Sequence, residues 1–203
     1  MSRHYAVLAL SLFAFTVGAT GCQSLKNIGS PADGLTAAEV AQILDQGEAA
    51  AAKETSLVRV DADGKPQTTR MHIFVVDTRG KVIGRRSMED AWHGSISIAN
   101  AKAYTAMSFS SDQNALTSRT IGLLSQPGAP LWQIGNSNTK PGLIEFPGGL
   151  PLYKDGQLVG GVGVSGDGVE EDENVAEAAA AGFEAPQALR VDTVLDGAVA
   201  YTK

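Results

Sequence analysis

The sequence predicts an α+β domain in which helices pack on an antiparallel β-sheet. Two observations support this prediction. Two pairs of apolar segments are each joined by a short turn-forming stretch, as in β-hairpins, and segments with helical spacing of apolar residues lie before, between and after these pairs. The order helix, hairpin, helices, hairpin, helix is typical of an antiparallel sheet with helices packed on it.

Residues 1–21 have the features of a secretory signal peptide. Arg3 and His4 form a short polar start, and the apolar run "YAVLALSLFAFTVGA" that follows is too short to span a bilayer comfortably. Small residues come after this run, as they do before a cleavage site. We therefore expect an exported protein.

The junction "ATGCQS" places Cys22, the only cysteine, directly after three small residues, and it resembles a bacterial lipobox. This resemblance implies that Cys22 becomes the lipidated mature N-terminus, with residues 22–34 as a polar tether to the membrane. The alternative is an ordinary signal peptide that leaves a free thiol. The expected location is the cell envelope, with the protein lipid-anchored and facing the periplasm or the cell surface.

Composition excludes several classes of function. The net charge of −6 does not provide the basic surface that nucleic-acid binding needs. The domain has no cysteine, so disulfides and Cys-based zinc or iron–sulfur sites are excluded. Beyond the N-terminal segment only His72 and His93 remain, which excludes a mechanism that needs three histidines.

The main domain is predicted over residues 35–186 and begins with a helix over residues 36–54. Thr36 and Glu39 have the spacing of a capping box, in which each side chain satisfies a backbone amide at the start of the helix. The following stretch "VDADGKPQT" is predicted to be a loop.

The first hairpin is predicted from the apolar run 71–76, the turn 77–80 and the strand 81–86. Both faces of the first strand carry large side chains, which favours a central strand that is covered on both sides. A helix rich in small residues is expected over residues 95–109, and a second, short helix over residues 115–124.

The second hairpin is predicted from strands 149–153 and 158–164, joined by a tight turn at Asp155-Gly156. A final helix follows, with the acidic run 170–173 in its first turn, and it ends at Gly182. We interpret the acidic run as a solvated start of the helix. Residues 187–203 are predicted to form a C-terminal tail.

The glycines of "GGVGVSGDG" match the spelling Gly-x-Gly-x-x-Gly of a dinucleotide-binding loop. Such a loop requires a strand-to-helix turn within a parallel unit, whereas Gly161 and Gly163 fall inside the second strand of a hairpin. The acids at 170–173 would also repel a pyrophosphate. We therefore attribute these glycines to the close approach of another backbone or a flat ligand.

Two stretches, "RSMEDAWHGSISIANAKAYTA" and "FPGGLPLYKDGQLVGGVGVSG", resemble the GlcG/HbpS-like family (DUF336), which also forms the C-terminal domain of PduO-type proteins. The resemblance covers about residues 35–183. The positions that carry it are Asp77, Gly80, Met88, Ala91, Gly94, Ser95, Ala99, Lys102, Ala103, Thr105, Ala106, Phe146, Pro147, Gly148, Gly149, Pro151, Gly156, Gly160, Gly163, Val164, Ser165, Gly166 and Asp172. It implies a profilin-like α+β domain that is usually oligomeric and that in several members binds haem, with haem degradation in some.

Haem binding requires an apolar slot, an axial donor to the iron and cations near the propionates. His93 is the best-placed axial candidate, with a surface histidine as the alternative. His72 is a weaker candidate because it fits a core strand, and Met88 could donate a thioether or fill the core. Lys102 is a candidate propionate partner. Tyr104 is a candidate oxygen donor, with an aromatic core residue as its alternative.

The leading functional hypothesis is a lipid-anchored protein that binds haem or a related tetrapyrrole for sequestration or sensing. Two alternatives are a haem-degrading enzyme and a non-enzymatic module that binds a small metabolite or a partner without haem. A dehydrogenase site is not supported because the glycines at 161 and 163 fall inside a hairpin strand. A hydrolase site is not supported because the residues around Ser165 lack the last glycine of Gly-x-Ser-x-Gly. Helices of small residues and glycine-rich strands favour a homo-oligomer.

Overall fold

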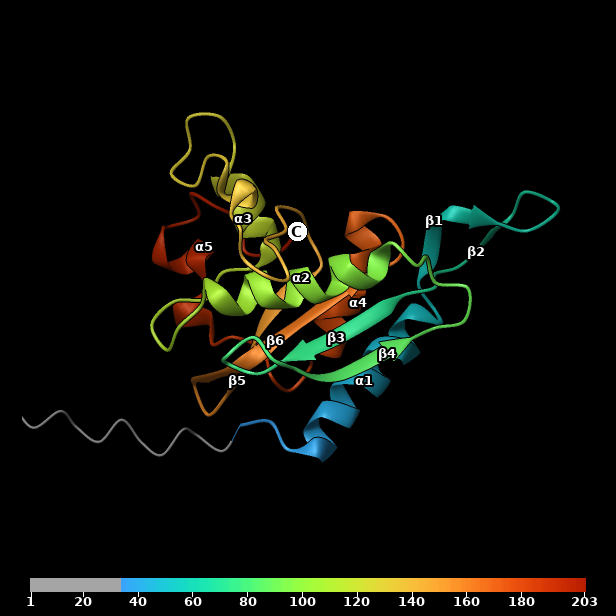
Figure 1. The fold of residues 1–203 in the computed structure, drawn as a ribbon, viewed down its shortest axis with the longest axis horizontal. Helices are drawn as coiled ribbons and strands as arrows, with labels where there is room; N and C mark the ends of the chain where they lie inside the picture. The colour runs from blue at the N-terminus through green and yellow to red at the C-terminus, as the bar shows by residue number, and fades with distance from the viewer. Residues whose placement is uncertain (1–33) are drawn as a thin grey trace, which may run out of the picture. The chain divides into compact units, whose positions relative to one another are not determined.

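The structure is a computed structural model that describes residues 34–203, so the predicted signal peptide and Cys22 lie outside the described residues. Figure 1 shows the described elements in chain order. They are α1 (Ala37–Ala51), β1 (Thr55–Val60), β2 (Pro66–Thr68), β3 (His72–Val76), β4 (Val82–Ser87), α2 (Ser95–Ser108), α3 (Ser118–Leu124), a 3-10 turn (Ile134–Asn136), β5 (Gly149–Lys154), β6 (Gln157–Ser165), α4 (Val169–Ala179), a second 3-10 turn (Gln187–Leu189) and α5 (Val191–Val194).

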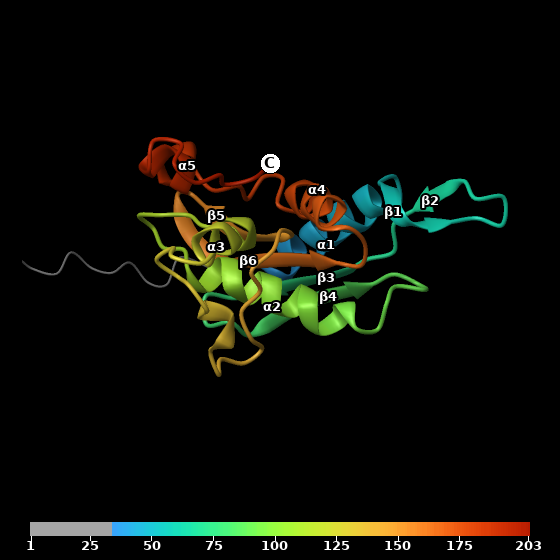
Figure 2. The ribbon, with the colours of Figure 1, turned by 90° about the horizontal axis from the view of Figure 1, so that it is seen from above.

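The main sheet has four strands in the order β4-β3-β6-β5, and every neighbouring pair is antiparallel. Helix α2 covers one face, and α1 and α4 pack side by side on the other, as Figure 2 shows from above. All five residues of β3 are buried. The predicted α+β class and the central strand covered on both sides are therefore confirmed.

The two faces of the sheet carry two apolar clusters because side chains of a strand alternate between faces. Ile73 and Val75 of β3 pack with residues of α1 and α4, whereas Phe74 and Val76 pack with Ala99, Ala103 and Met107 of α2. The mixture of large groups on both sides of β3 thus reflects two separate cores.

Helix α1 begins with the predicted capping box. The Thr36 hydroxyl accepts from the Glu39 amide, and the Thr36 amide donates to the Glu39 carboxylate at 2.7 Å. The Lys154 ammonium lies 2.7 Å from the same carboxylate, and its hydrogen bond, together with those of Thr36, lowers the pKa of Glu39 to about 2. The helix ends at Ala51, three residues earlier than predicted.

The glycines of β6 lie where α2 approaches the sheet. A Cβ atom on Gly163 would lie 2.1 Å from the carbonyl oxygen of Ala99 and 2.3 Å from the amide nitrogen of Ala103. A Cβ atom on Gly161 would lie 2.5 Å from the Ala103 carbonyl oxygen. The interpretation of the glycine run as a site of close backbone approach is confirmed, and the approaching backbone is that of α2.

The stretch after α1 forms a small hairpin, so the prediction of a loop at 60–68 is confirmed for the turn at 61–65 and was wrong for the residues that belong to β1 and β2. Strands β1 and β2 pair antiparallel, and the Asp61 carboxylate accepts from the amides of Asp63 and Lys65, each at 2.9 Å, to hold the turn. The hairpin extends away from the main sheet (Figure 1). Its residues are mostly exposed on both faces, so the sequence lacks the alternation that marks a half-buried strand.

The C-terminal segment 187–203 packs on the domain and belongs to the same compact unit as the preceding residues. Val191 and Tyr201 are buried with Ala115, Tyr153 and Ala185. The Thr117 hydroxyl also donates to the Tyr201 carbonyl at 2.6 Å. The segment that the sequence suggests is a tail therefore completes a third apolar cluster.

Candidate functional site

The predicted haem-binding residues lie in different parts of the domain. His72, Met88 and His93 lie near the start of α2, Lys102 lies inside the domain, and Tyr104 lies in the second half of α2. The helix rises about 1.5 Å per residue, so Tyr104 lies about 14 Å along its axis from Ser95. The five predicted residues therefore do not form a single site.

Lys102 is fully buried, which places its ammonium away from any surface where a propionate could bind. Its Nζ donates to Oδ2 of Asp172 at 2.6 Å and to the Val164 carbonyl at 2.9 Å. Burial lowers the pKa of Lys102 and raises the pKa of Asp172, because both charges lose water, while their mutual attraction opposes both shifts. Lys102 thus joins α2 to β6 and α4 rather than meeting a ligand.

The other carboxylate oxygen of Asp172 orders the turn between β6 and α4. Oδ1 accepts from the amides of Gly166 and Asp167 at 3.0 and 3.1 Å. The backbone of Gly148 lies so close to the Lys102 ammonium that a Cβ on Gly148 would be 2.8 Å from the Lys102 nitrogen. Asp172, which the sequence analysis did not single out for chemistry, is therefore the centre of a buried polar cluster.

Glu173 is also fully buried, and it pairs with Arg119 of α3. The Arg119 Nε lies 3.0 and 2.9 Å from the two oxygens of the Glu173 carboxylate, and an Arg119 Nη2 donates to Glu170 at 2.7 Å. The interpretation of the acidic run 170–173 as a solvated helix start was therefore wrong for Asp172 and Glu173. Both are counter-ions for cations that α2 and α3 bring into the interior.

His72 and Met88 are both engaged within the protein. Both ring nitrogens of His72 are occupied, Nδ1 by the Ser87 hydroxyl at 2.8 Å and Nε2 by the Trp92 carbonyl at 2.9 Å. The Met88 sulfur accepts from the Met71 amide at 3.4 Å, and its side chain packs on the core. Neither side chain presents a donor atom to a ligand.

His93 is the exposed imidazole of the described chain, in the turn that leads into α2. Its side chain makes no hydrogen bond with any residue of 34–203. Next to it, the Trp92 ring is 48% exposed, and the Arg59 guanidinium lies 5.5 Å from the ring centroid. His93 is thus an exposed imidazole directly after Trp92 in the chain, and the Arg59 guanidinium lies over the Trp92 ring.

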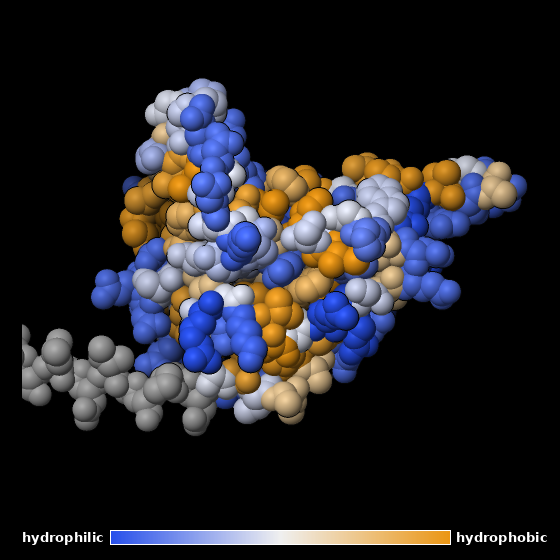
Figure 3. All heavy atoms as spheres, in the orientation of Figure 1, coloured by the Kyte–Doolittle hydropathy of each residue, from blue (hydrophilic) through white to orange (hydrophobic). Residues whose placement is uncertain are grey.

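Arg59 reaches this place from β1. Its Nη2 donates to the Asp90 carbonyl at 2.7 Å, and its Nε is buried without a hydrogen-bond partner among the described residues. Exposed Leu57 and Val60 lie on the same hairpin, and Figure 3 shows apolar atoms at its base. Sequence reasoning missed Arg59 because no strand was predicted between the helix at 36–54 and the loop at 60–68, where the structure has β1.

Tyr104 borders a separate hollow of about 330 Å³ at the β3–β4 turn. Arg79, Met107 and Leu158 also line this hollow. The Tyr104 ring packs so closely on Gly80 that a Cβ there would lie 2.7 Å from the ring atoms. The hollow combines a phenol, a thioether and a cation, but it contains no imidazole.

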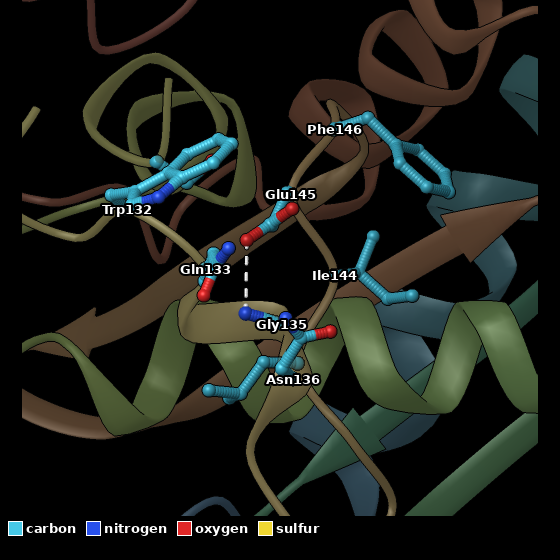
Figure 4. A pocket seen from close by; sticks show the side chains of 9 residues that line it. Trp132, Gln133, Gly135, Asn136, Ile144, Glu145 and Phe146 are labelled. Atoms are coloured by element: carbon cyan, nitrogen blue, oxygen red, sulfur yellow. Dashed lines mark hydrogen bonds between the residues drawn. The ribbon is translucent and has the colours of Figure 1, made fainter. Parts of the chain in front are cut away.

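A second hollow, of about 460 Å³, lies between the segment after α3 and the segment before β5. Figure 4 shows Trp132 and Phe146 on either side of Glu145, whose carboxylate accepts from the Gly135 amide at 2.9 Å. None of the predicted site residues borders it. Its signal in the sequence is a pair of aromatic residues in a stretch otherwise rich in Gly, Pro, Ser and Asn.

Within residues 34–203, no cluster of three or more His, Cys, Asp or Glu side chains is arranged to hold a metal ion. In the same range, every helix is too short or too polar to cross a membrane.

Residues 35–181 match the family model described as "Haem degrading protein HbpS-like". The chain belongs to the HbpS-like family. This HbpS-like protein is 37% identical over 109 residues to the corrinoid adenosyltransferase PduO of Citrobacter freundii, a match that covers 54% of this chain and 31% of that enzyme. The chain thus spans less than a third of the length of that curated relative.

Solved structures share the fold of this HbpS-like protein. The Klebsiella pneumoniae protein ORFY, of family DUF336, is 28% identical with a TM-score of 0.62, over 78% of this chain and 96% of that one. The complex of PduOC with haem is 23% identical with a TM-score of 0.61, over 84% and 99% of the two chains. The crystal structure of HbpS is 25% identical with a TM-score of 0.56, over 73% and 89%.

Proposed function

We propose that this HbpS-like protein binds haem or a related tetrapyrrole, for sequestration or sensing, through His93 at the start of α2. The observation that carries the proposal is that His93 is exposed and follows Trp92, the residue whose ring lies 5.5 Å from the Arg59 guanidinium. His72, the other described imidazole, is hydrogen-bonded at both nitrogens. The match to a haem-degrading family supports the choice of ligand.

The residues present fit the chemistry of haem. A neutral imidazole nitrogen is an iron ligand, an exposed indole face suits the macrocycle, and a guanidinium pairs with a carboxylate such as a propionate. The unpartnered Nε of Arg59 supports this assignment, since a buried donor costs free energy until it is paired. Bound haem would supply the iron, and His93, Trp92 and Arg59 would hold and orient it.

A second position deserves the same test, because Tyr104 and Arg79 border a hollow. A phenol oxygen can ligate haem iron, and Arg79 is largely exposed at the rim. The volume of about 330 Å³ is at the lower end of the range for ligand pockets, so it would enclose only part of a macrocycle. We therefore place it second to His93.

Titration of the purified protein with hemin tests both positions. A saturable shift of the Soret band is expected, with His93→Ala weakening the affinity at least tenfold and Tyr104→Phe leaving it within twofold. Val194→Ala, at an exposed position of the C-terminal segment, is the control and should leave the affinity unchanged. The opposite ranking would move the site to Tyr104, and the absence of saturable binding would refute haem binding altogether.

Haem degradation is the alternative function, and the description of the family favours it. In that case the protein would hold the macrocycle while an added oxidant or reductant drives its cleavage. The haem complex is then incubated with peroxide or ascorbate, and released iron is measured with a chelator. Release that is faster than from free hemin supports degradation, and an equal rate supports sequestration or sensing.

We also propose that lipid on Cys22 anchors the protein to the cell envelope. The lipobox-like junction and the polar stretch after it support this proposal. Mass spectrometry of the mature N-terminal peptide should show an acylated Cys22. A Cys22→Ser variant should move from the membrane fraction to the soluble fraction, and an unchanged distribution would contradict the anchor.

We further propose that the protein assembles into a homo-oligomer. Leu57, Val58 and Val60 of β1 are between 48 and 69% exposed, and a second copy would remove this apolar surface from water. Light scattering of the purified protein gives the assembly mass directly. A monomer at micromolar concentration would contradict this part of the proposal.

A further inference from the structure

We propose that the hollow beside Glu145 is a second ligand site, which takes a small organic cation with an apolar body. The hollow has a volume of about 460 Å³, within the range of small-molecule sites. Its lining includes none of Arg59, Trp92 and His93, so this site is separate from the proposed haem site. Figure 4 shows the side chains that surround it.

Two aromatic rings border the hollow. Trp132 is 51% exposed and Phe146 is 38% exposed, and both belong to its lining. In the view of Figure 4 the two rings lie on either side of the Glu145 carboxylate. Faces of aromatic rings attract cations, with Trp the strongest, so this pair suits a positively charged group.

One oxygen of the Glu145 carboxylate is fixed and the other is available. Oε1 accepts from the Gly135 amide at 2.9 Å, and a Cβ on Gly135 would lie 3.0 Å from the same carboxyl group. Oε2 accepts no hydrogen bond from any residue of 34–203. The carboxylate is thus held in place while it retains an acceptor for a ligand.

The walls of the hollow are attached to the helical part of the domain. The Ile144 amide donates to the Thr105 hydroxyl of α2 at 2.9 Å. On α3, a Cβ on Gly122 would lie 2.0 Å from the Glu145 carbonyl oxygen, so only glycine permits this contact. Because both attachments involve helices, the Glu145 side of the site is formed before a ligand binds.

The charges around the hollow select a cation over an anion. Its lining contains the Glu145 carboxylate and the amides of Gln133 and Asn136, but no Lys or Arg. The Lys102 ammonium lies 5.1 Å from the Phe146 centroid, yet Asp172 compensates its charge at 2.6 Å. A dicarboxylate such as haem would meet Glu145 without a counter-ion, whereas an ammonium would gain both the carboxylate and the rings.

The probe for this site is benzyltrimethylammonium, with benzyl alcohol and benzoate as neutral and anionic controls of similar size. Calorimetric titration of the full protein at constant ionic strength should show saturable binding of the ammonium alone. The chain has two tryptophans, so in a Trp92→Phe background quenching reports on Trp132. Equal binding of benzoate, or the absence of ammonium binding, would overturn the proposal.

Three variants connect the binding to named residues. Glu145→Gln keeps an acceptor for the Gly135 amide but removes the charge, so the affinity should fall at least tenfold. Trp132→Ala should abolish measurable binding, whereas Glu89→Gln, an exposed acid elsewhere, should change nothing. Unfolding curves show which variants remain folded. Unchanged affinity in a folded Glu145→Gln or Trp132→Ala protein would refute the site, and hemin titration of the same variants keeps the test of haem binding independent.

Discussion

The ammonium nitrogen of Lys102 lies 2.6 Å from Oδ2 of Asp172, and the two side chains are 0% and 2% exposed. Through this pair and the Val164 carbonyl, α2 on one face of the sheet is joined to α4 on the other. A charge in such a place is tolerated only while it is paired and hydrogen-bonded. The pair therefore acts as a cross-link between the two helical layers.

Removal of one partner should leave the other charge buried and unpaired. We expect Lys102→Met to lower the free energy of unfolding by about 3–5 kcal/mol, measured by urea denaturation. The double variant with Asp172→Asn should lose less than the sum of the two single variants, because it leaves no unpaired charge. Additive losses would contradict the coupling. Arg79→Ala, which breaks an exposed pair, is the control and should cost less than about 1 kcal/mol.

A methyl group on Gly163 should force α2 away from the sheet. The nearest atoms belong to the Ala99 and Ala103 backbone, which cannot move aside as a flexible side chain would. Gly163→Ala should therefore lower the free energy of unfolding by about 3 kcal/mol. Gly94→Ala, where a Cβ would meet nothing within 4 Å, should change it by less than about 0.5 kcal/mol. Equal urea midpoints for the two variants would show that the contact is not rigid.

Tyr153 should make the fold sensitive to high pH. Its hydroxyl donates to the Ser111 carbonyl at 2.7 Å, and burial raises its pKa from 10.0 to about 12. Since the folded pKa is the higher one, the protonated phenol stabilises the fold below about pH 10, and this stabilisation is lost as the pH rises to about 12. The contribution is about 2–3 kcal/mol. Urea midpoints between pH 8 and 12 measure it.

Tyr153→Phe is the control for this alkaline transition. In this variant the free energy of unfolding should lose the part of its pH dependence that belongs to Tyr153. The part that belongs to Tyr201 should remain, because burial also raises the pKa of Tyr201. Tyrosinate absorbance identifies which phenol titrates late. An identical slope in the variant and the parent protein would assign the transition to other groups.

The C-terminal segment should contribute to stability through Tyr201. This side chain is 4% exposed, and the Arg190 guanidinium lies 5.1 Å from its ring centroid. We expect Tyr201→Ala to cost about 3 kcal/mol in urea denaturation, because it empties a buried aromatic site. Val194→Ala, at a 52% exposed position of the same segment, should cost less than about 0.5 kcal/mol. Similar costs for both would mean that the segment packs loosely.

Much of the fold could be predicted because its patterns are local. The capping box at Thr36 and Glu39, the turn at Asp155-Gly156 and the end of α4 before Gly182 are set by residues close together in the chain. The hairpin β1–β2 escaped prediction because its exposed strands have no periodic burial. Local patterns also gave no sign that the C-terminal segment returns to Tyr153.

The partners of charged residues could not be predicted in the same way. Asp172 lies four residues before Ala176 and seven before Ala179, on the buried stripe of α4, but its position in an acidic run led to the interpretation that it is solvated. Its partner Lys102 is 70 residues away in the chain, and only the tertiary structure brings the two together. His93 was proposed as a ligand from its position before α2, and this remains a prediction, while Arg59 depended on the unpredicted hairpin.

The close approach of α2 to Gly161 and Gly163 has a mechanical consequence. Because backbone lies against backbone, α2 can neither rotate nor slide on the sheet without a clash, so the helix is a rigid rod held at its centre. The proposed haem position lies at one end of this rod, and Thr105, near the other end, holds the segment of Glu145. Each position can therefore gain or lose its ligand without deforming the other, and the two ligands should bind independently.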